Sequence, residues 1–126
     1  MNIAVIPARG GSKRIPKKNI KNFYGRPMIS YSIKAAQDSK IFDRIIVSTD
    51  SNEIASVAKE HGADIPFLRP KDISDDFATT GDVMRHATNF LKKEHESLDS
   101  ICCIYATAPL IQKDDLVKGF EIFNNK

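Results

Sequence analysis

The sequence predicts an α/β domain built on a mostly parallel sheet with helices on both faces. Two patterns lead to this prediction. Short apolar runs, typical of buried strands, alternate with segments whose apolar residues recur at helical spacing. The first run, over residues 2–7, is also apolar without alternation, as in strands covered on both faces. At 126 residues, with 41% hydrophobic and 28% charged residues, the chain has the size and composition of one globular domain.

Four strand and helix pairs are expected along the chain. The strands are predicted over residues 2–7, 44–48, 64–68 and 100–106. The helices are predicted from Pro27 to about 39, from a cap at Asp50 or Ser51 to Gly62, from Thr79 to about 93, and over 116–123. Pro27 suits a first helical turn, and the spacing of Thr79 and Asp82 resembles a capping box. Long connections are expected over 8–25 and 69–78.

The connections that follow the strands are expected to hold the ligand. In open parallel sheets, ligands bind beyond the carboxyl ends of the strands. The segment after the first strand, the turn at Asp50, the segment from Arg69 and the connection over 107–112 should all gather at that edge. The sequence therefore predicts a site there.

Basic residues are concentrated near the N-terminus. The net charge is only +3, but seven of the 19 basic residues and none of the 16 acidic residues lie within the first 26 positions. Such a cluster indicates a compact polyanionic ligand. Nucleic acid is disfavoured, because the basic stretch has no aromatic residue before Phe23 and the remainder of the chain is net acidic.

The segment after the first predicted strand has the residues of a phosphate-binding loop. Gly10 and Gly11 allow backbone N–H groups to face an anion, and Arg9 and Lys18 can form charge-assisted hydrogen bonds to phosphate oxygens. The segment fits neither a Walker loop nor the G-x-G-x-x-G pattern. The alternative is a solvated loop whose lysines only aid solubility.

No apolar run is long enough to cross a bilayer, and the N-terminus lacks the features of a secretion signal. We therefore expect a cytoplasmic protein with no membrane partner. Cys102 and Cys103 are adjacent, so they cannot bridge each other with ordinary geometry and do not form a zinc site. We expect them to be strand residues on alternate faces.

Four linked motifs resemble the acylneuraminate cytidylyltransferase family. They are IPARGGSKRIPKKNIK at 6–21, GRPMI at 25–29, IIVSTD at 45–50 and FLRP at 67–70, in the family's order. With SICCIYATAPL at 100–110, the chain is most similar to the pseudaminic acid branch. The sialic acid branch usually has glutamine and proline where Tyr105 and Ala106 stand.

The resemblance implies a Rossmann-like nucleotide-diphospho-sugar transferase fold. It implies a nucleotidyltransferase that moves CMP from CTP to a nine-carbon α-keto acid sugar, pseudaminic acid or a sialic-acid-like sugar, and releases pyrophosphate. By position, Arg9 and Lys18 would be catalytic, because positive groups stabilise charge on the phosphates in transit. The substrate-binding residues would be Arg9, Gly10, Gly11, Ser12, Lys13, Lys18, Asn19, Arg69, Ala78, Thr80 and Tyr105.

In this set, Arg69, the backbone of Ala78 and the hydroxyl of Thr80 match the cytidine pocket of the family. Each position also has a structural alternative. Arg69 could pair with an acidic residue of the 72–75 stretch, Thr80 could cap its helix, and Tyr105 could pack in the core. For Asp50, helix capping ranks above catalysis.

The family also implies Mg²⁺, which would bridge triphosphate oxygens. Its metal aspartates lie in an Asp-x-Asp motif near the C-terminal part of a longer chain, and nothing after Pro109 matches that motif. Residues 1–126 are therefore expected to be the nucleotide-binding portion of a cytidylyltransferase domain without its C-terminal part. The full-length form would be a homodimer. The alternatives are another sugar nucleotidyltransferase, such as one for deoxyoctulosonate, and a noncatalytic nucleotide-binding or regulatory domain.

Overall fold

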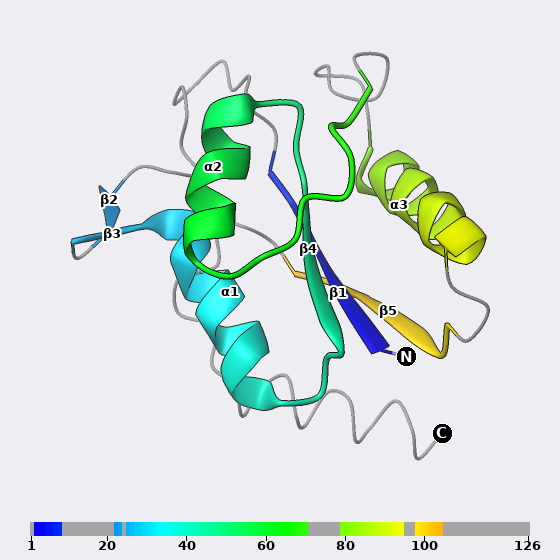
Figure 1. Cartoon of the computed structure of the whole chain (residues 1–126), viewed down its shortest axis with the longest axis horizontal. Coiled ribbons are helices and arrows are strands. Elements are labelled where there is room, and N and C mark those ends of the chain that lie inside the picture. The colour runs from blue at the N-terminus through cyan, green and yellow to red at the C-terminus, as the bar shows by residue number, and fades with distance from the viewer. Residues whose placement is uncertain (1, 9–21, 24, 71–78, 95–97, 105–126) are drawn as a thin grey trace.

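A three-stranded parallel sheet forms the centre of the molecule. The computed structural model describes residues 2–8, 22–23, 25–70, 79–94 and 98–104. In the sheet, β1 (Asn2–Pro7) lies between β4 (Arg44–Ser48) and β5 (Ser100–Cys103), and both pairings are parallel (Figure 1). The predicted parallel sheet is thus confirmed for these strands.

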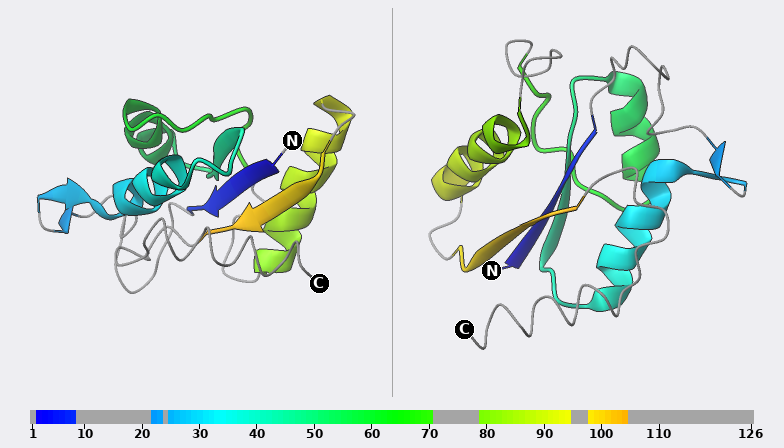
Figure 2. Two further views of the ribbon diagram at one scale, coloured as in Figure 1. Left: turned by 90° about the horizontal axis from the view of Figure 1, so that it is seen from below. Right: turned by 180° about the vertical axis from the view of Figure 1, so that it is seen from behind.

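Helices cover both faces of the sheet. On one face lie α1 (Met28–Ser39) and α2 (Asn52–Glu60), and on the other lies α3 (Thr80–Glu94), as the views of Figures 1 and 2 agree. A small antiparallel pair, β2 (Asn22–Phe23) and β3 (Arg26–Pro27), precedes α1. This layered arrangement is the one that the alternating strand and helix pattern predicts.

Alternation along β1 divides the core into two clusters. Ala4 and Ile6 pack in the cluster under α1 and α2, whereas Ile3 and Val5 pack in the cluster under α3. All four side chains are fully buried, which explains why the strand is apolar without interruption. Burying an aliphatic side chain of the size of isoleucine contributes about 1.5 to 3 kcal/mol. The sheet is therefore held from both faces.

The helix boundaries follow from local capping. Ser51 caps α2, because its hydroxyl accepts a hydrogen bond from the N–H of Ile54 at 3.3 Å. The prediction that Asp50 caps this helix is wrong, since Asp50 stands one residue too early. Beyond the other end of α2, Gly62 adopts a φ of +96°, a conformation that favours glycine.

The capping box predicted for α3 is confirmed. The N–H of Thr79 donates to Oδ2 of Asp82 at 3.0 Å, and the N–H of Asp82 donates to Oγ1 of Thr79 at 3.1 Å. Thr79 is therefore the capping residue, so the alternative in which Thr80 caps the helix is wrong. Thr80 is the first residue of α3 and is exposed.

The predicted third strand over 64–68 is wrong. Asp64 makes only an isolated parallel bridge to Ile46, through hydrogen bonds with Ile45 and Val47. In a parallel ladder the next donor would be the N–H of Pro66, which proline lacks. Further along this segment, the N–H of Arg69 donates to the carbonyl of Thr49, the residue after β4, at 2.8 Å.

Two further boundaries differ from the prediction. The connection expected over 8–25 contains β2, a strand of two residues that carries too little pattern to be recognised in a sequence. Pro27 precedes α1 rather than forming its first turn, because its ψ of 138° is extended. The end of the fourth predicted strand and the helix over 116–123 lie outside the described residues.

Both cysteines are free and half-buried in β5, so the prediction that they are strand residues is confirmed. Burial raises the pKa of both thiols above the ordinary value, and the neighbouring Cys102 raises that of Cys103 further. Among the helices that the structure describes, none has the length and apolar composition that crossing a membrane requires.

Candidate functional site

The carboxyl ends of β1 and β4 meet at one edge of the sheet. The N–H of Ala8, the residue after β1, donates to the carbonyl of Ser48 at 2.9 Å. The N–H of Ile104, the residue after β5, donates to the carbonyl of Val5 at 3.0 Å. This edge is where an open parallel sheet binds its ligands. We refer to the described residues at it, Ala8, Ser48, Thr49 and Arg69, as the carboxyl edge.

Arg69 is the predicted site residue that the structure places at the carboxyl edge. Its side chain is bound to Ser48 through two hydrogen bonds, from Nε to Oγ at 3.2 Å and from Nη2 to the backbone carbonyl at 2.7 Å. The residue is only 6% exposed. Guanidinium groups keep their charge under all ordinary conditions. A permanent cation is therefore fixed beside the end of β4.

Strand alternation explains which side of the sheet Arg69 occupies. Ile46 packs in the cluster under α3, and Ser48, two residues later, faces the same side. Phe67 packs against that cluster and contacts the rings of His86 and Phe90 edge-on, at centroid distances of 4.7 and 5.0 Å. The segment leading to Arg69 is thus anchored on the α3 side of the sheet.

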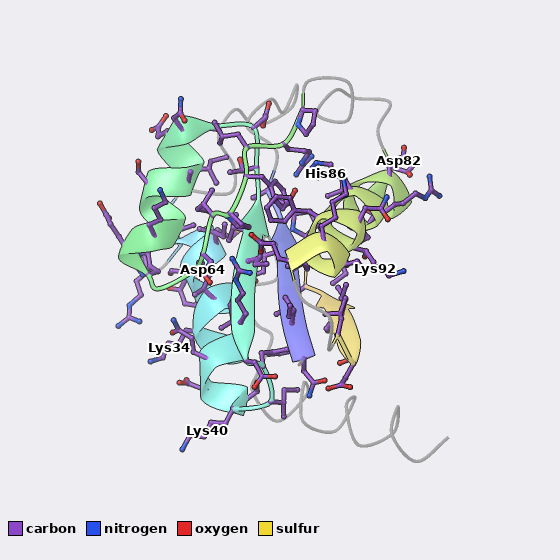
Figure 3. The ribbon with its side chains drawn as sticks, turned by 45° about the vertical axis from the view of Figure 1, so that its right-hand side comes forward. Lys34, Lys40, Asp64, Asp82, His86 and Lys92 are labelled. Carbon is purple, nitrogen blue, oxygen red and sulfur yellow. The ribbon has the colours of Figure 1, made fainter. Side chains whose placement is uncertain are left out.

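The N-terminal end of α3 also points toward the carboxyl edge. Figure 3 shows Asp82 at this end of the molecule and Lys40 at the opposite end. Hydrogen bonds from the backbone and the hydroxyl of Thr79 hold the pKa of Asp82 below its ordinary value. The predicted site residue Thr80 lies between Thr79 and Asp82 in the sequence, at the start of the helix.

Most predicted site residues lie outside the described residues. These are Arg9, Gly10, Gly11, Ser12, Lys13, Lys18, Asn19, Ala78 and Tyr105. Of the complete set, the structure describes Arg69 and Thr80. The acidic residues proposed as alternative partners of Arg69 are likewise outside the described ranges.

The sequence analysis missed Ser48 as a site residue and treated it only as part of a strand. A signal was present in the sequence, because the hydroxyl residues Ser48 and Thr49 directly follow the apolar run 45–47. The structure buries both of them fully. Buried polar side chains require hydrogen-bond partners. What the sequence could not reveal is that the partner of Ser48 would come from 21 residues further along the chain.

No metal site can be assigned within the described ranges, because they contain no group of three His, Cys, Asp or Glu side chains placed to hold an ion. Within the part of the chain that the structure describes, two surface hollows lie away from the carboxyl edge. One, of about 530 Å³, is lined by Arg44, Lys59 and residues 62–66, and another, of about 430 Å³, lies between residues of α1 and the end of α2. Neither is lined by a predicted site residue.

The sheet order, the helices on both faces and the buried arginine at the carboxyl edge define a Rossmann-like α/β protein. The chain matches the cytidylyltransferase family over residues 3–126, and it belongs to that family.

Curated relatives share the sequence over nearly the whole chain. Pseudaminic acid cytidylyltransferase of Campylobacter jejuni subsp. jejuni serotype O:2 is 50% identical over 122 residues, which is 97% of this chain and 53% of that protein. CMP-N,N'-diacetyllegionaminic acid synthase of Legionella pneumophila is 39% identical, over 95% of this chain and 52% of that protein. The chain thus spans about half the length of these relatives.

A solved structure confirms the fold. CMP:2-keto-3-deoxy-manno-octonic acid synthetase, in complex with CTP, superimposes with a TM-score of 0.82 at 22% sequence identity. The match covers 99% of this chain and 48% of that one. This match confirms the predicted fold class, and the match over residues 3–126 confirms the family resemblance.

Proposed function

We propose that this protein is the nucleotide-binding portion of an enzyme that transfers CMP from CTP to a nine-carbon α-keto acid sugar and releases pyrophosphate. The observation that carries the proposal is the match to the cytidylyltransferase family over residues 3–126. This chain covers only about half of the length of each relative. The catalytic domain as a whole would therefore require further residues.

Pseudaminic acid is the sugar that the comparisons favour. Identity is 50% to the pseudaminic acid enzyme of C. jejuni and 39% to the legionaminic acid enzyme of L. pneumophila. The residues at Tyr105 and Ala106, which differ from the usual sialic acid pattern, point in the same direction. A sialic-acid-like sugar is the next candidate.

In this proposal, Arg69 reads the cytosine together with the backbone of Ala78 and the hydroxyl of Thr80. Cytosine offers O2 and N3 as acceptors, and a guanidinium offers donors in a fixed plane. The burial of Arg69 and its two hydrogen bonds to Ser48 support this role, because a reader of base edges must be held still.

Arg9 and Lys18 would hold the triphosphate, with the loop residues Gly10, Gly11, Ser12, Lys13 and Asn19. In the reaction, the anomeric hydroxyl of the sugar attacks the α-phosphorus while the bond from that phosphorus to pyrophosphate breaks. The hydroxyl loses its proton, and pyrophosphate leaves with the bonding electrons. Cations near the phosphates stabilise the charge that develops on the leaving group. No covalent intermediate on the protein is required.

Mg²⁺ enters this proposal with the nucleotide, as the MgCTP complex. The described residues offer no ligand group for it, so no step is assigned to a protein-bound ion. We also propose that the full-length protein is a homodimer and acts in the cytoplasm, where CTP is available. Neither nucleic acid nor a membrane is part of the proposed reaction.

Pyrophosphate release tests the proposal most directly. The full-length gene product, supplied with CTP, Mg²⁺ and pseudaminic acid, is expected to release pyrophosphate in step with CMP-sugar formation. Omitting the sugar or chelating the metal should stop the release. A product that binds CTP tightly without Mg²⁺ and forms no CMP-sugar would identify a regulatory domain instead.

Substitutions in the basic segment test the assignment of the phosphate contacts. Arg9→Ala or Lys18→Ala should weaken CTP binding by about tenfold or more and make it less salt-sensitive, because each removes a charge-assisted hydrogen bond. Calorimetric titrations at two salt concentrations measure both effects. Lys34→Ala is the matched control, since Lys34 is an exposed lysine on α1 that pairs with Asp38. Unchanged titrations for both variants would remove Arg9 and Lys18 from the site.

A further inference from the structure

Ser48 holds Arg69, one of the two described residues whose side chains are proposed to read the base. Its hydroxyl oxygen and its backbone carbonyl both accept hydrogen bonds from Arg69. We propose that Ser48 is a positioning residue, which orients the Arg69 guanidinium for recognition of cytosine. This inference rests on the proposed function and deepens it by naming a residue that determines the choice of nucleotide.

The geometry of the contact fixes the plane of the guanidinium. Nε and Nη2 lie along one edge of the group, and both donate to atoms of the same residue, at 3.2 and 2.7 Å. Two hydrogen bonds along one edge restrict the rotation of the group about its long axis. The direction of the opposite edge is therefore set by the position of Ser48.

Ser48 is itself held rigidly by the sheet. It is the last residue of β4, it is fully buried, and it stands opposite Pro7 in the register with β1. A long arginine side chain has many rotamers, and holding it against a strand removes that freedom before the nucleotide arrives. The side chain of Arg69 thus loses its conformational entropy when the protein folds and not when the nucleotide binds.

The same carbonyl connects two parts of the proposed site. Besides Nη2 of Arg69, it accepts the N–H of Ala8, and Ala8 directly precedes Arg9. A carbonyl oxygen has two lone pairs and can accept both bonds. The carbonyl oxygen of Ser48 therefore binds both Ala8, where the basic segment begins, and the guanidinium of Arg69, which would read the base. This shared acceptor keeps the two groups close together.

The hydroxyl is the part of this arrangement that mutation can remove alone. Ser48→Ala keeps the backbone carbonyl and deletes only the acceptor of Nε. In the full-length gene product, we expect the dissociation constant for CTP to rise about tenfold and the preference for CTP over UTP to fall, because the guanidinium loses one of its two hydrogen bonds to Ser48. Binding of inorganic tripolyphosphate should stay unchanged, since it has no base to read. Calorimetry with these three ligands gives all the values.

Three comparisons separate positioning from a general structural effect. Ser48→Thr, which keeps the acceptor, should restore the preference, and Ser48→Cys, whose sulfur is a weak acceptor, should resemble the alanine variant. In an Arg69→Ala background, Ser48→Ala should cause no further loss, because the two residues act as one unit. Ser39→Ala is the control, as it deletes another buried serine hydrogen bond, to the carbonyl of Ala36 at the far end of α1.

The outcomes distinguish this inference from the proposed function. If the unmodified protein binds no CTP, the proposed function fails and the inference fails with it. If it binds CTP and Arg69→Ala loses the base preference while Ser48→Ala and Ser48→Cys keep it, the proposed function stands and the positioning role is wrong. Equal weakening of CTP and tripolyphosphate binding by the Ser48 variants would also overturn the positioning role.

Discussion

Two arginine side chains lie at opposite ends of β4, and they donate hydrogen bonds to different kinds of oxygen atom. Arg44, the first residue of the strand, donates to carboxylates, with Nε at 2.9 Å from Asp64 and Nη1 at 3.0 Å from Glu94. Arg69 donates to the neutral oxygens of Ser48, the last residue of the strand. At one end of the strand charge is therefore paired with charge, and at the other end an arginine donates to two uncharged oxygen atoms of the strand itself.

The difference indicates what each arginine does. Burial lowers the pKa of the Arg44 guanidinium, but the hydrogen bonds to Glu94 and Asp64 outweigh this effect and raise that pKa. These contacts join β4 to the end of α3 and to the segment after α2, so they stabilise the fold. The hydrogen bonds that Arg69 donates to Ser48 hold the guanidinium through uncharged acceptors, which suits the proposed contact with an electron-rich base edge.

The largest expected effect is on nucleotide binding. Arg69→Ala should weaken CTP binding by about 10- to 100-fold, because hydrogen bonds from a charged group contribute about 1.5 to 3 kcal/mol. Arg44→Ala should leave the dissociation constant for CTP unchanged, since Arg44 lies at the opposite end of the strand. Calorimetry on both variants of the full-length gene product measures the contrast. Equal losses of affinity would show that the two ends of β4 do not differ in function.

For the free energy of unfolding, in contrast to CTP binding, Arg44 is the arginine expected to matter. Arg44→Ala is expected to lower the free energy of unfolding by about 1 to 2 kcal/mol, because it breaks two ion pairs of which each contributes up to about 1 kcal/mol. The carboxylates are 57% and 40% exposed, so added salt should reduce the loss. Urea unfolding at low and high salt measures both quantities.

A matched control for this effect is Lys34→Ala. It removes a pair with Asp38 that is 4.0 Å long and exposed on both sides, so the free energy of unfolding should hardly change. If the two variants lost the same stability, the partial burial of Arg44 would have no energetic consequence.

The sequence predicted those parts of the fold that depend on local pattern. The range of β1 follows from an apolar run whose alternate residues are Ile3 and Val5 on one face and Ala4 and Ile6 on the other. The reciprocal cap of α3 follows from the spacing of Thr79 and Asp82, since capping involves near neighbours only. Both are properties of adjacent residues and require no knowledge of the tertiary structure.

Apart from shifts of one residue at helix ends, the errors arose where a distant partner decides the structure. Residues 64–68 have the composition of a strand, but whether they pair depends on register against β4, and that register puts Pro66 where a donor is needed. The position of Arg69 at the carboxyl edge was predicted from the pattern of strands and connections, and its place in the cytidine pocket from the family resemblance, whereas its contact with Ser48 was not predicted. A contact between two residues that the sequence separates by a helix leaves no periodic signal.

The smallest expected effects concern two neighbouring threonines at the start of α3. Thr79→Ala should lower the free energy of unfolding by about 1 kcal/mol, because it removes the helix cap. Its effect on CTP binding should be slight. Thr80→Ala should do the reverse, weakening CTP binding with little loss of stability, because Thr80 is exposed and is not the capping residue. Unfolding and calorimetric measurements on the two variants form the test, and identical profiles would remove Thr80 from the proposed pocket.

Acid should remove the contribution that the charge of Asp82 makes to the same cap. Thr79 holds the pKa of Asp82 below the ordinary value of 3.8, so the folded state favours the charged carboxylate. The stabilisation from this group is complete above the pKa of the unfolded chain and disappears as the pH falls through the lower pKa of the folded state. The difference in unfolding free energy between the unmodified protein and Asp82→Asn should therefore be constant near about pH 6 and shrink in acid. A difference that stays constant in acid would mean that the negative charge of Asp82 does not strengthen the cap, and that Thr79 stabilises α3 through its hydroxyl alone.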